Sequence, residues 1–194
     1  MTGGPGVQAV YETMTDPASK LRLAYPQCPK GLGKIITSPD SPDLIADVRA
    51  DPIAVWPDDR GYFLEAARLG VRGMEDFVET QVSVSLSYPG TIKAFHYHLE
   101  QYDYWTPAAG MLQAALIDLR EESPTFGARN TFYIGSLRPW RLLIPPGVAH
   151  GYKVIGDAPA VLVYLTSRHY NPADEGRLPH DHAALNYDWS TQHK

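Results

Sequence analysis

Two histidines, His96 and His98, lie two positions apart in the mostly apolar run 91–99. Such a run predicts a β-strand, in which alternate side chains point to the same face, so both imidazoles would face one side. An imidazole can act as a general base near neutral pH or as a ligand for a transition metal. We therefore expect this strand to line a pocket that the rest of the chain builds around it.

The spacing around these histidines is compatible with a metal site. Five residues follow the spacing of the first motif of metal-binding cupins: Gly90, His96, His98, Asp103 and Gly110. Asp103 stands where that motif usually has glutamate, and residues 145–150, which end in His150, resemble part of the second motif. Three imidazoles and a carboxylate suit a divalent transition metal. One hypothesis is therefore a metal-dependent cupin enzyme that uses His96, His98, Asp103 and His150.

More of the chain supports acid–base chemistry without a metal. Five stretches follow one another in the sequence: residues 58–63, the strand with His96, and residues 118–127, 144–151 and 164–172. In this order they resemble the dTDP-4-dehydrorhamnose 3,5-epimerase family, whose members are metal-free, cupin-like dimers. The most characteristic runs are Ser-Pro-Thr-Phe-Gly at 123–127 and Ile-Pro-Pro-Gly-Val-Ala-His-Gly at 144–151. The resemblance covers residues 44–189 and leaves the preceding segment outside.

The resemblance implies roles for particular residues. His96 falls on the family's general base, and Tyr164 falls on the tyrosine that acts as an acid from the opposite face. Five residues fall on positions that contact the nucleotide sugar or lie near it, with Lys93 in place of the family's arginine: Arg60, Glu65, Gln81, Lys93 and His150. His98 is added to the substrate-binding set as a second residue of the same pocket wall, and its alternatives are a metal ligand and a surface residue. The implied substrate is a nucleotide-diphospho-4-keto-(6-deoxy)hexose, and neither a cofactor nor a metal ion is implied. A proton beside a C4 ketone is acidic because the resulting carbanion is an enolate, so a base and an acid on opposite faces can invert the carbon.

Two departures from the family pattern affect this chemistry. The family has a lysine downstream of the histidine that stabilises the enolate oxygen, but residues 102–105 read Tyr-Asp-Tyr-Trp. The family also pairs its base with an aspartate from the C-terminal part, and that motif does not occur before Lys194. Losing such electrostatic stabilisation costs on the order of 10²–10³ in rate. Either nearby groups substitute (His98, Asp103 and Lys93 are nearest in sequence), or the substrate differs, or the protein binds nucleotide sugars without catalysis.

Many short strands must position these residues. Gly/Pro turn signals separate most of a series of candidate strands, at residues 44–49, 53–56, 62–65, 79–86, 91–98, 111–118, 131–134, 141–144, 151–154 and 160–166. This pattern predicts an all-β sandwich or barrel. With the resemblance, the expected fold is a cupin-like double-stranded β-helix, or jelly roll. Residues 66–77 are the best candidate for a short helix.

The first 43 residues differ from the rest. They are rich in Pro, Gly, Ser and Thr, with one possible helical piece at residues 7–14. We interpret residues 1–43 as an N-terminal arm that packs over the domain or over a neighbouring subunit, and residues 44–194 as the cupin-like epimerase domain.

The composition limits the partners and the location. A chain of 194 residues is long enough for one domain with a real core. The net charge of −5 provides no basic field for nucleic acid, and no apolar run is long enough for a membrane span. The single cysteine, Cys28, cannot form an internal disulfide, which fits a reducing cytoplasm. We expect a nucleotide-sugar substrate and, by resemblance, a homodimer.

Overall fold

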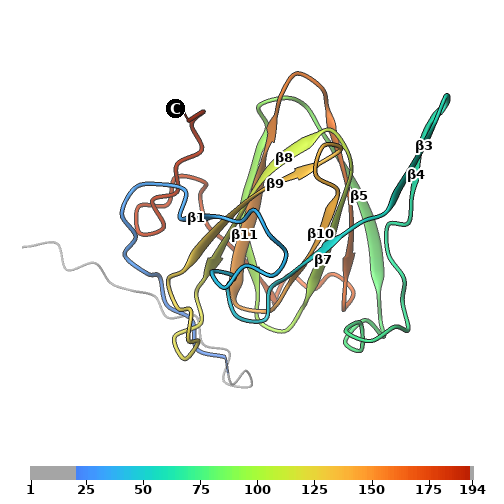
Figure 1. The fold of residues 1–194 in the computed structure, drawn as a ribbon. Coiled ribbons are helices and arrows are strands. Elements are labelled where there is room, and N and C mark those ends of the chain that lie inside the picture. Colours follow the sequence, from blue (N-terminus) through green and yellow to red (C-terminus); the bar gives the residue numbers. More distant parts are fainter. Residues whose placement is uncertain (1–20, 193–194) are drawn as a thin grey trace, which may run out of the picture.

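Two β-sheets face each other in the computed structural model, which describes residues 21–192 (Figure 1). The six-stranded sheet has the order β1 (Lys34–Ile35), β9 (Arg129–Gly135), β8 (Met111–Asp118), β11 (Val148–Ile155), β6 (Ile92–His98) and β13 (Glu175–Arg177). The five-stranded sheet has the order β2 (Arg49–Pro52), β10 (Trp140–Ile144), β7 (Asp103–Ala109), β12 (Ala160–Thr166) and β5 (Gln81–Ser87). All neighbours pair antiparallel except β1 with β9. The all-β, cupin-like prediction is confirmed.

A two-stranded hairpin, β3 (Val55–Asp58) and β4 (Gly61–Leu64), projects away from the two sheets (Figure 1). The predicted piece at residues 7–14 lies outside the described residues. Within residues 21–192 there is no helix that is long and apolar enough to span a membrane.

The six-stranded sheet is buried on both faces. Leu112, Ala114 and Leu116 of β8 pack between the two sheets, whereas Ala115 and Ile117 pack outward in a second cluster with the chain's terminal segments. A strand covered on both sides is expected to be mostly apolar, as β8 is between its buried Gln113 and Asp118. On β6 the same arrangement directs Phe95 and Tyr97 outward, beneath Leu185, Tyr187 and Trp189. His96 and His98 must therefore face the space between the sheets.

The short helix predicted at residues 66–77 is wrong. This segment consists of turns, and Gly70 and Gly73 adopt left-handed φ angles of 72° and 86°, which a helix cannot accommodate. Met74 and Phe77 anchor the segment by packing on Tyr104. The strand expected at residues 44–49 is also wrong, since those residues form turns and β2 begins only at Arg49.

The Ser-Pro-Thr-Phe-Gly run builds a structural corner, not part of the pocket. Asp118 is fully buried and accepts hydrogen bonds from Arg120, Ser123 and Thr125. Burial opposes a low pKa for Asp118, but these hydrogen bonds outweigh it and lower the pKa. The corner fixes the end of β8, which pairs with β11 and so aligns His150.

Candidate active site

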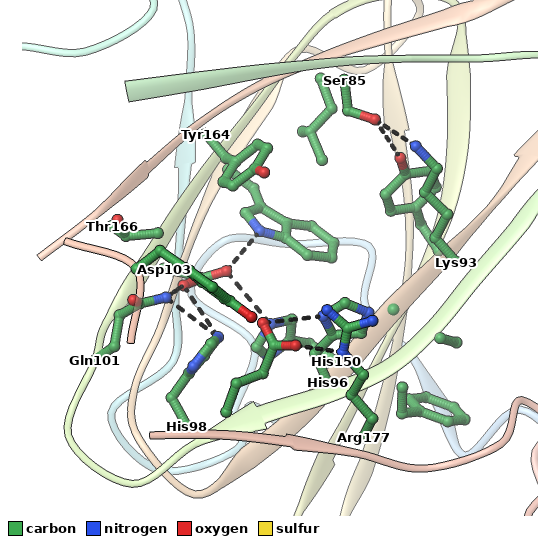
Figure 2. Close-up of a pocket in the computed structure, with 18 of the residues that line it drawn as sticks. Ser85, Lys93, His96, His98, Gln101, Asp103, His150, Tyr164, Thr166 and Arg177 are labelled. Atoms are coloured by element: carbon green, nitrogen blue, oxygen red, sulfur yellow. Dashed lines mark hydrogen bonds and ion pairs between the residues drawn. The ribbon is translucent and has the colours of Figure 1, made fainter. Parts of the chain in front are cut away.

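A cavity of about 600 Å³ lies between the sheets (Figure 2). Its walls come from strands β5, β6, β7, β11, β12 and β13, with Tyr170 beyond the end of β12. Six of the predicted site residues line it: Gln81, Lys93, His96, His98, His150 and Tyr164. The fold therefore brings together side chains that are as much as 83 positions apart, from Gln81 to Tyr164.

Two predicted residues do not reach this cavity. Arg60 lies at the turn of the β3–β4 hairpin and forms an exposed ion pair with Asp58. Glu65 follows β4 and pairs with Arg68 at 2.6 Å, again in solvent. Neither side chain can act in the cavity of its own chain in this arrangement.

His96 and Tyr164 lie on opposite walls. His96 belongs to β6 of the six-stranded sheet, and Tyr164 belongs to β12 of the five-stranded sheet, so a ligand between the sheets would meet one on each side (Figure 2). Both side chains are only half-buried. This is the arrangement that a two-base inversion requires.

The electrostatic surroundings keep His96 neutral. Burial is the main cause that lowers the pKa of His96 to about 4, and the charge of the neighbouring His150 lowers it further. Glu175 acts in the other direction, with its Oε2 atom 3.8 Å from Nδ1 of His96. At neutral pH the imidazole therefore carries a lone pair that can accept a proton.

Asp103 is the centre of a buried network. Its Oδ1 atom accepts a hydrogen bond of 2.7 Å from the Gln101 amide, and its Oδ2 atom accepts one of 3.2 Å from the Trp105 indole. His150 Nε2 lies 3.3 Å from the same Oδ2, while His150 Nδ1 donates to the Val148 carbonyl. Burial alone would raise the pKa of Asp103, but the hydrogen bond from His150 and the nearby imidazoles lower it to about 2. Asp103 is therefore ionised at neutral pH.

The same network bears on the metal hypothesis. One ligand atom from each of His98, Asp103 and His150 lies within 4.8 Å of the others, and His96 is not in this group. However, the Gln101 amide nitrogen lies 3.1 Å from His98 Nε2 and 2.7 Å from Asp103 Oδ1. Because an NH₂ group can only donate, it already engages one atom of His98 and one atom of Asp103 that could otherwise bind an ion. This donor set supports a closed hydrogen-bond network better than a metal centre.

Two cations lie along the cavity. Lys93 donates a 2.6 Å hydrogen bond to Ser85, and Arg177 of β13 lies opposite His96 in the strand register (Figure 2). Gln81, at the start of β5, accepts a hydrogen bond from the Tyr170 backbone. Lysine and arginine beside a partly apolar cavity suit an anionic ligand such as a diphosphate.

Sequence reasoning missed two features of the site. It did not predict β7, which carries Asp103, because Pro107 argues against a strand. It also left the polar segment after residue 171 without a role, although Glu175 and Arg177 line the cavity. The available signal was the alternation Glu175-Gly176-Arg177, which places both charges on one face of a strand.

Comparisons with known proteins agree with this geometry. The dTDP-4-dehydrorhamnose 3,5-epimerase family model matches residues 44–194. The spore coat polysaccharide biosynthesis protein SpsL of Bacillus subtilis is 44% identical over 77% of this chain and 99% of its own length. The probable low-salt glycan biosynthesis epimerase Agl13 of Haloferax volcanii is 36% identical over 76% of this chain and 96% of its own.

A solved structure shares the fold. NovW, a 4-keto-6-deoxy sugar epimerase from the novobiocin gene cluster of Streptomyces spheroides, is 28% identical and superposes with a TM-score of 0.66 over 76% of each chain. The family match includes every strand of the two sheets except β1, and every predicted residue of the cavity. The chain therefore belongs to the dTDP-4-dehydrorhamnose 3,5-epimerase family.

Proposed function

We propose that this protein epimerises a nucleotide-diphospho-4-keto-(6-deoxy)hexose at a carbon next to the C4 ketone. The observation that carries the proposal is the neutral His96 on one sheet facing the wall that holds Tyr164 on the other. The 4-keto-6-deoxy sugar epimerase activity of NovW supports the same substrate class.

The proposed reaction begins with proton abstraction by His96. The Nδ1 atom of its imidazole faces Glu175, which leaves Nε2 for the substrate C–H bond. The electrons of that bond form an enolate, with the negative charge on the C4 oxygen. Tyr164 then donates its hydroxyl proton to the opposite face of the carbon, which inverts the configuration, and solvent resets both side chains.

Substrate binding is assigned to the remaining residues of the cavity. Gln81, Lys93, His98 and His150 contact the nucleotide sugar in this proposal, and the cations Lys93 and Arg177 hold its diphosphate. Arg60 and Glu65 can contribute only from a second copy of the chain, because their hairpin projects away from their own cavity (Figure 1).

A homodimer is part of the proposal, and β5 supports it. This edge strand turns Gln81, Ser83 and Ser85 inward, whereas Val82, Val84 and Leu86 point outward and are 61%, 66% and 57% exposed. The β3–β4 hairpin likewise exposes apolar side chains: Trp56, Tyr62 and Phe63. Two exposed apolar surfaces and an open strand edge suit contact between two copies, with the hairpin of one copy covering β5 of the other.

The division of the chain and its location are also proposals. We propose that residues 44–194 form the epimerase domain and that residues 1–43 form an arm; the family match over 44–194 supports this division. At Lys34–Ile35 (β1), the proposed arm adds a short parallel strand beside β9. We place the protein in the cytoplasm, which the single free cysteine, Cys28, supports.

Solvent-deuterium exchange tests the proposed function. The purified protein is incubated in D₂O with a panel of 4-keto nucleotide sugars, and mass spectrometry and NMR follow deuterium at the carbons beside the ketone. We expect exchange at one or both of these carbons with at least one sugar of the panel. Measurable binding without any exchange would instead favour a nucleotide-sugar-binding protein.

Light scattering tests the dimer. We expect a mass of about twice 21.5 kDa for the wild-type protein, and a shift toward the monomer in Phe63→Glu, because a charge on the apolar hairpin opposes burial. Leu137→Glu is the matched control, since Leu137 is 87% exposed in the turn between β9 and β10, which belongs neither to the hairpin nor to β5, and should leave the mass unchanged. A monomeric wild-type protein that still performs exchange would contradict the role given to the hairpin.

A further inference from the structure

A buried carboxylate faces the proposed base from a strand that the sequence did not predict. Glu175 belongs to β13, and its side chain is only 10% exposed. One carboxylate oxygen, Oε1, accepts a hydrogen bond from Arg177. The other, Oε2, lies 3.8 Å from Nδ1 of His96. We infer that Glu175 is a positioning residue that holds the Nδ1 side of His96, so that Nε2 is presented to the substrate; this inference rests on the proposed function.

The backbone around Glu175 is fixed by several independent contacts. Strand β13 pairs with β6, placing Glu175 opposite His98 and Arg177 opposite His96. Between them, Gly176 lies against the Tyr97 ring, where an added Cβ would come within 2.0 Å of Cζ. Only glycine fits there without displacing the ring. Glu175 is therefore held by a strand, and rigid elements position functional groups better than loops do.

The contacts on either side of β13 strengthen this placement. Before it, Asp174 accepts backbone hydrogen bonds from Leu99, Glu100 and Gln101, at 2.9, 2.8 and 3.2 Å. After it, Leu178 and Phe95 exchange two backbone hydrogen bonds of 2.7 and 2.9 Å. The Glu175 side chain thus reaches His96 from a backbone that is tied to β6 at both ends.

Glu175 supplies the negative charge that a protonated His96 needs. When His96 takes the substrate proton, an imidazolium forms beside His98 of β6, His150 of β11 and Arg177 of β13, all of which oppose its positive charge. Glu175 is the group around the ring that favours the charge. An oriented carboxylate also fixes the ring by accepting the Nδ1 proton, and catalytic hydrogen bonds that are long without substrate tighten when it binds.

The other carboxylate of the cavity is not available for this role. The sequence offers His98, Asp103 and Lys93 as groups that could substitute for the family's missing lysine and aspartate. Asp103 is the carboxylate among them, but it is engaged with Gln101, Trp105 and His150. Lys93 carries no negative charge, and its ammonium donates to Ser85. The structure therefore assigns the position beside His96 to Glu175.

The test compares Glu175→Gln with Glu175→Asp. Glutamine keeps the shape of the side chain and removes its charge, so we expect the pKa of His96, followed by NMR on ¹⁵N-histidine-labelled protein without substrate, to fall. We expect kcat for exchange to drop about 10- to 100-fold, because a mispositioned base loses part of the rate acceleration that a general base supplies. KM should change less than about 3-fold. Glu175→Asp keeps the charge and should return the pKa of His96 toward the wild-type value.

A matched control and two outcomes complete the design. Glu100→Gln removes an exposed carboxylate that pairs with Arg168, and should change neither the pKa of His96 nor kcat. If folded Glu175→Gln keeps the wild-type pKa of His96 and the wild-type kcat, the inference is overturned. The NMR titration needs no substrate, so it also informs on a protein without activity. If Glu175→Gln lowers the pKa of His96 but the wild-type protein performs no exchange, the proposed function is overturned and the contact between Glu175 and His96 is supported.

Discussion

Replacing His96 with asparagine is expected to lower the rate of solvent-deuterium exchange about 10³-fold, within the 10²–10⁴ that a general base supplies. Asparagine keeps a polar side chain in the half-buried position but cannot accept the substrate proton. Binding of the nucleotide sugar, measured by calorimetry, should change less than about 10-fold, because several other side chains line the cavity and remain in place.

His180→Asn is the matched control for this variant. His180 is exposed, and the described structure uses its backbone carbonyl, which accepts a hydrogen bond from Trp189. That contact survives the substitution, so exchange should proceed at the wild-type rate. If His96→Asn exchanges deuterium at the wild-type rate, His96 is not the general base and another group in the cavity must accept the proton.

The pH dependence provides a second measurement on the same residue. Burial is the main cause that lowers the pKa of His96 to about 4. The base form is the neutral imidazole, which is present above the pKa and is lost as the pH falls through it. The rate of exchange should therefore stay level from about pH 5 to 8 and decline near pH 4. The residual exchange of His96→Asn should lack this decline, and a wild-type inflection near 6.5, the ordinary pKa of histidine, would contradict a desolvated base.

The sequence predicted this part of the site because the relevant information is local. The alternation along β6 places Phe95 and Tyr97 on one face and His96 and His98 on the other, as expected from period two. Strands β8 and β12 also match their predicted bounds, since both are mostly apolar runs between turn residues. The family motifs then assigned Tyr164 to the facing wall, where the structure places it.

The parts that the sequence did not predict depend on distant contacts. Strand β13 has three residues, and its pairing with β6 joins distant positions, such as Glu175 and His98, which are 77 apart. The alternation Glu175-Gly176-Arg177 indicates a short strand, but no local pattern reveals the strand with which it pairs. The helix predicted at residues 66–77 is absent for a related reason. Met74 and Phe77 are buried against Tyr104 of β7, and this distant contact outweighs the weak helical propensity of the segment.

The Asp103 network should be the most sensitive point for stability in the cavity. Asp103→Asn keeps the size of the side chain but leaves His150 without its carboxylate partner in a fully buried position. We expect the free energy of unfolding, from urea denaturation at pH 7, to fall by about 3 kcal/mol, because hydrogen bonds to a charged group are the strong ones and the ionised carboxylate that accepts from Gln101 and Trp105 is lost. Asp157→Asn, in an exposed turn that accepts asparagine equally well, is the control and should change it by less than about 0.5 kcal/mol.

The effect of Asp103→Asn should also depend on pH with a defined sign. The pKa of Asp103 is held at about 2 in the folded protein and is about 3.9 in an unfolded chain. Its stabilising contribution is therefore complete above about pH 5 and is lost as the pH falls toward 2. The difference in unfolding free energy between wild type and Asp103→Asn should shrink over that interval.

A double-mutant cycle with His150→Gln identifies the partner. If His150 is the group that balances Asp103, the double variant should be less destabilised than the sum of the two single variants, by about 1 kcal/mol or more. Additive effects would mean that Gln101 and Trp105, the two hydrogen-bond donors to Asp103, carry the stabilisation instead. The cycle thereby decides whether Asp103 is stabilised by the charge of His150 or by its hydrogen bonds alone, in the stretch where the family has its lysine.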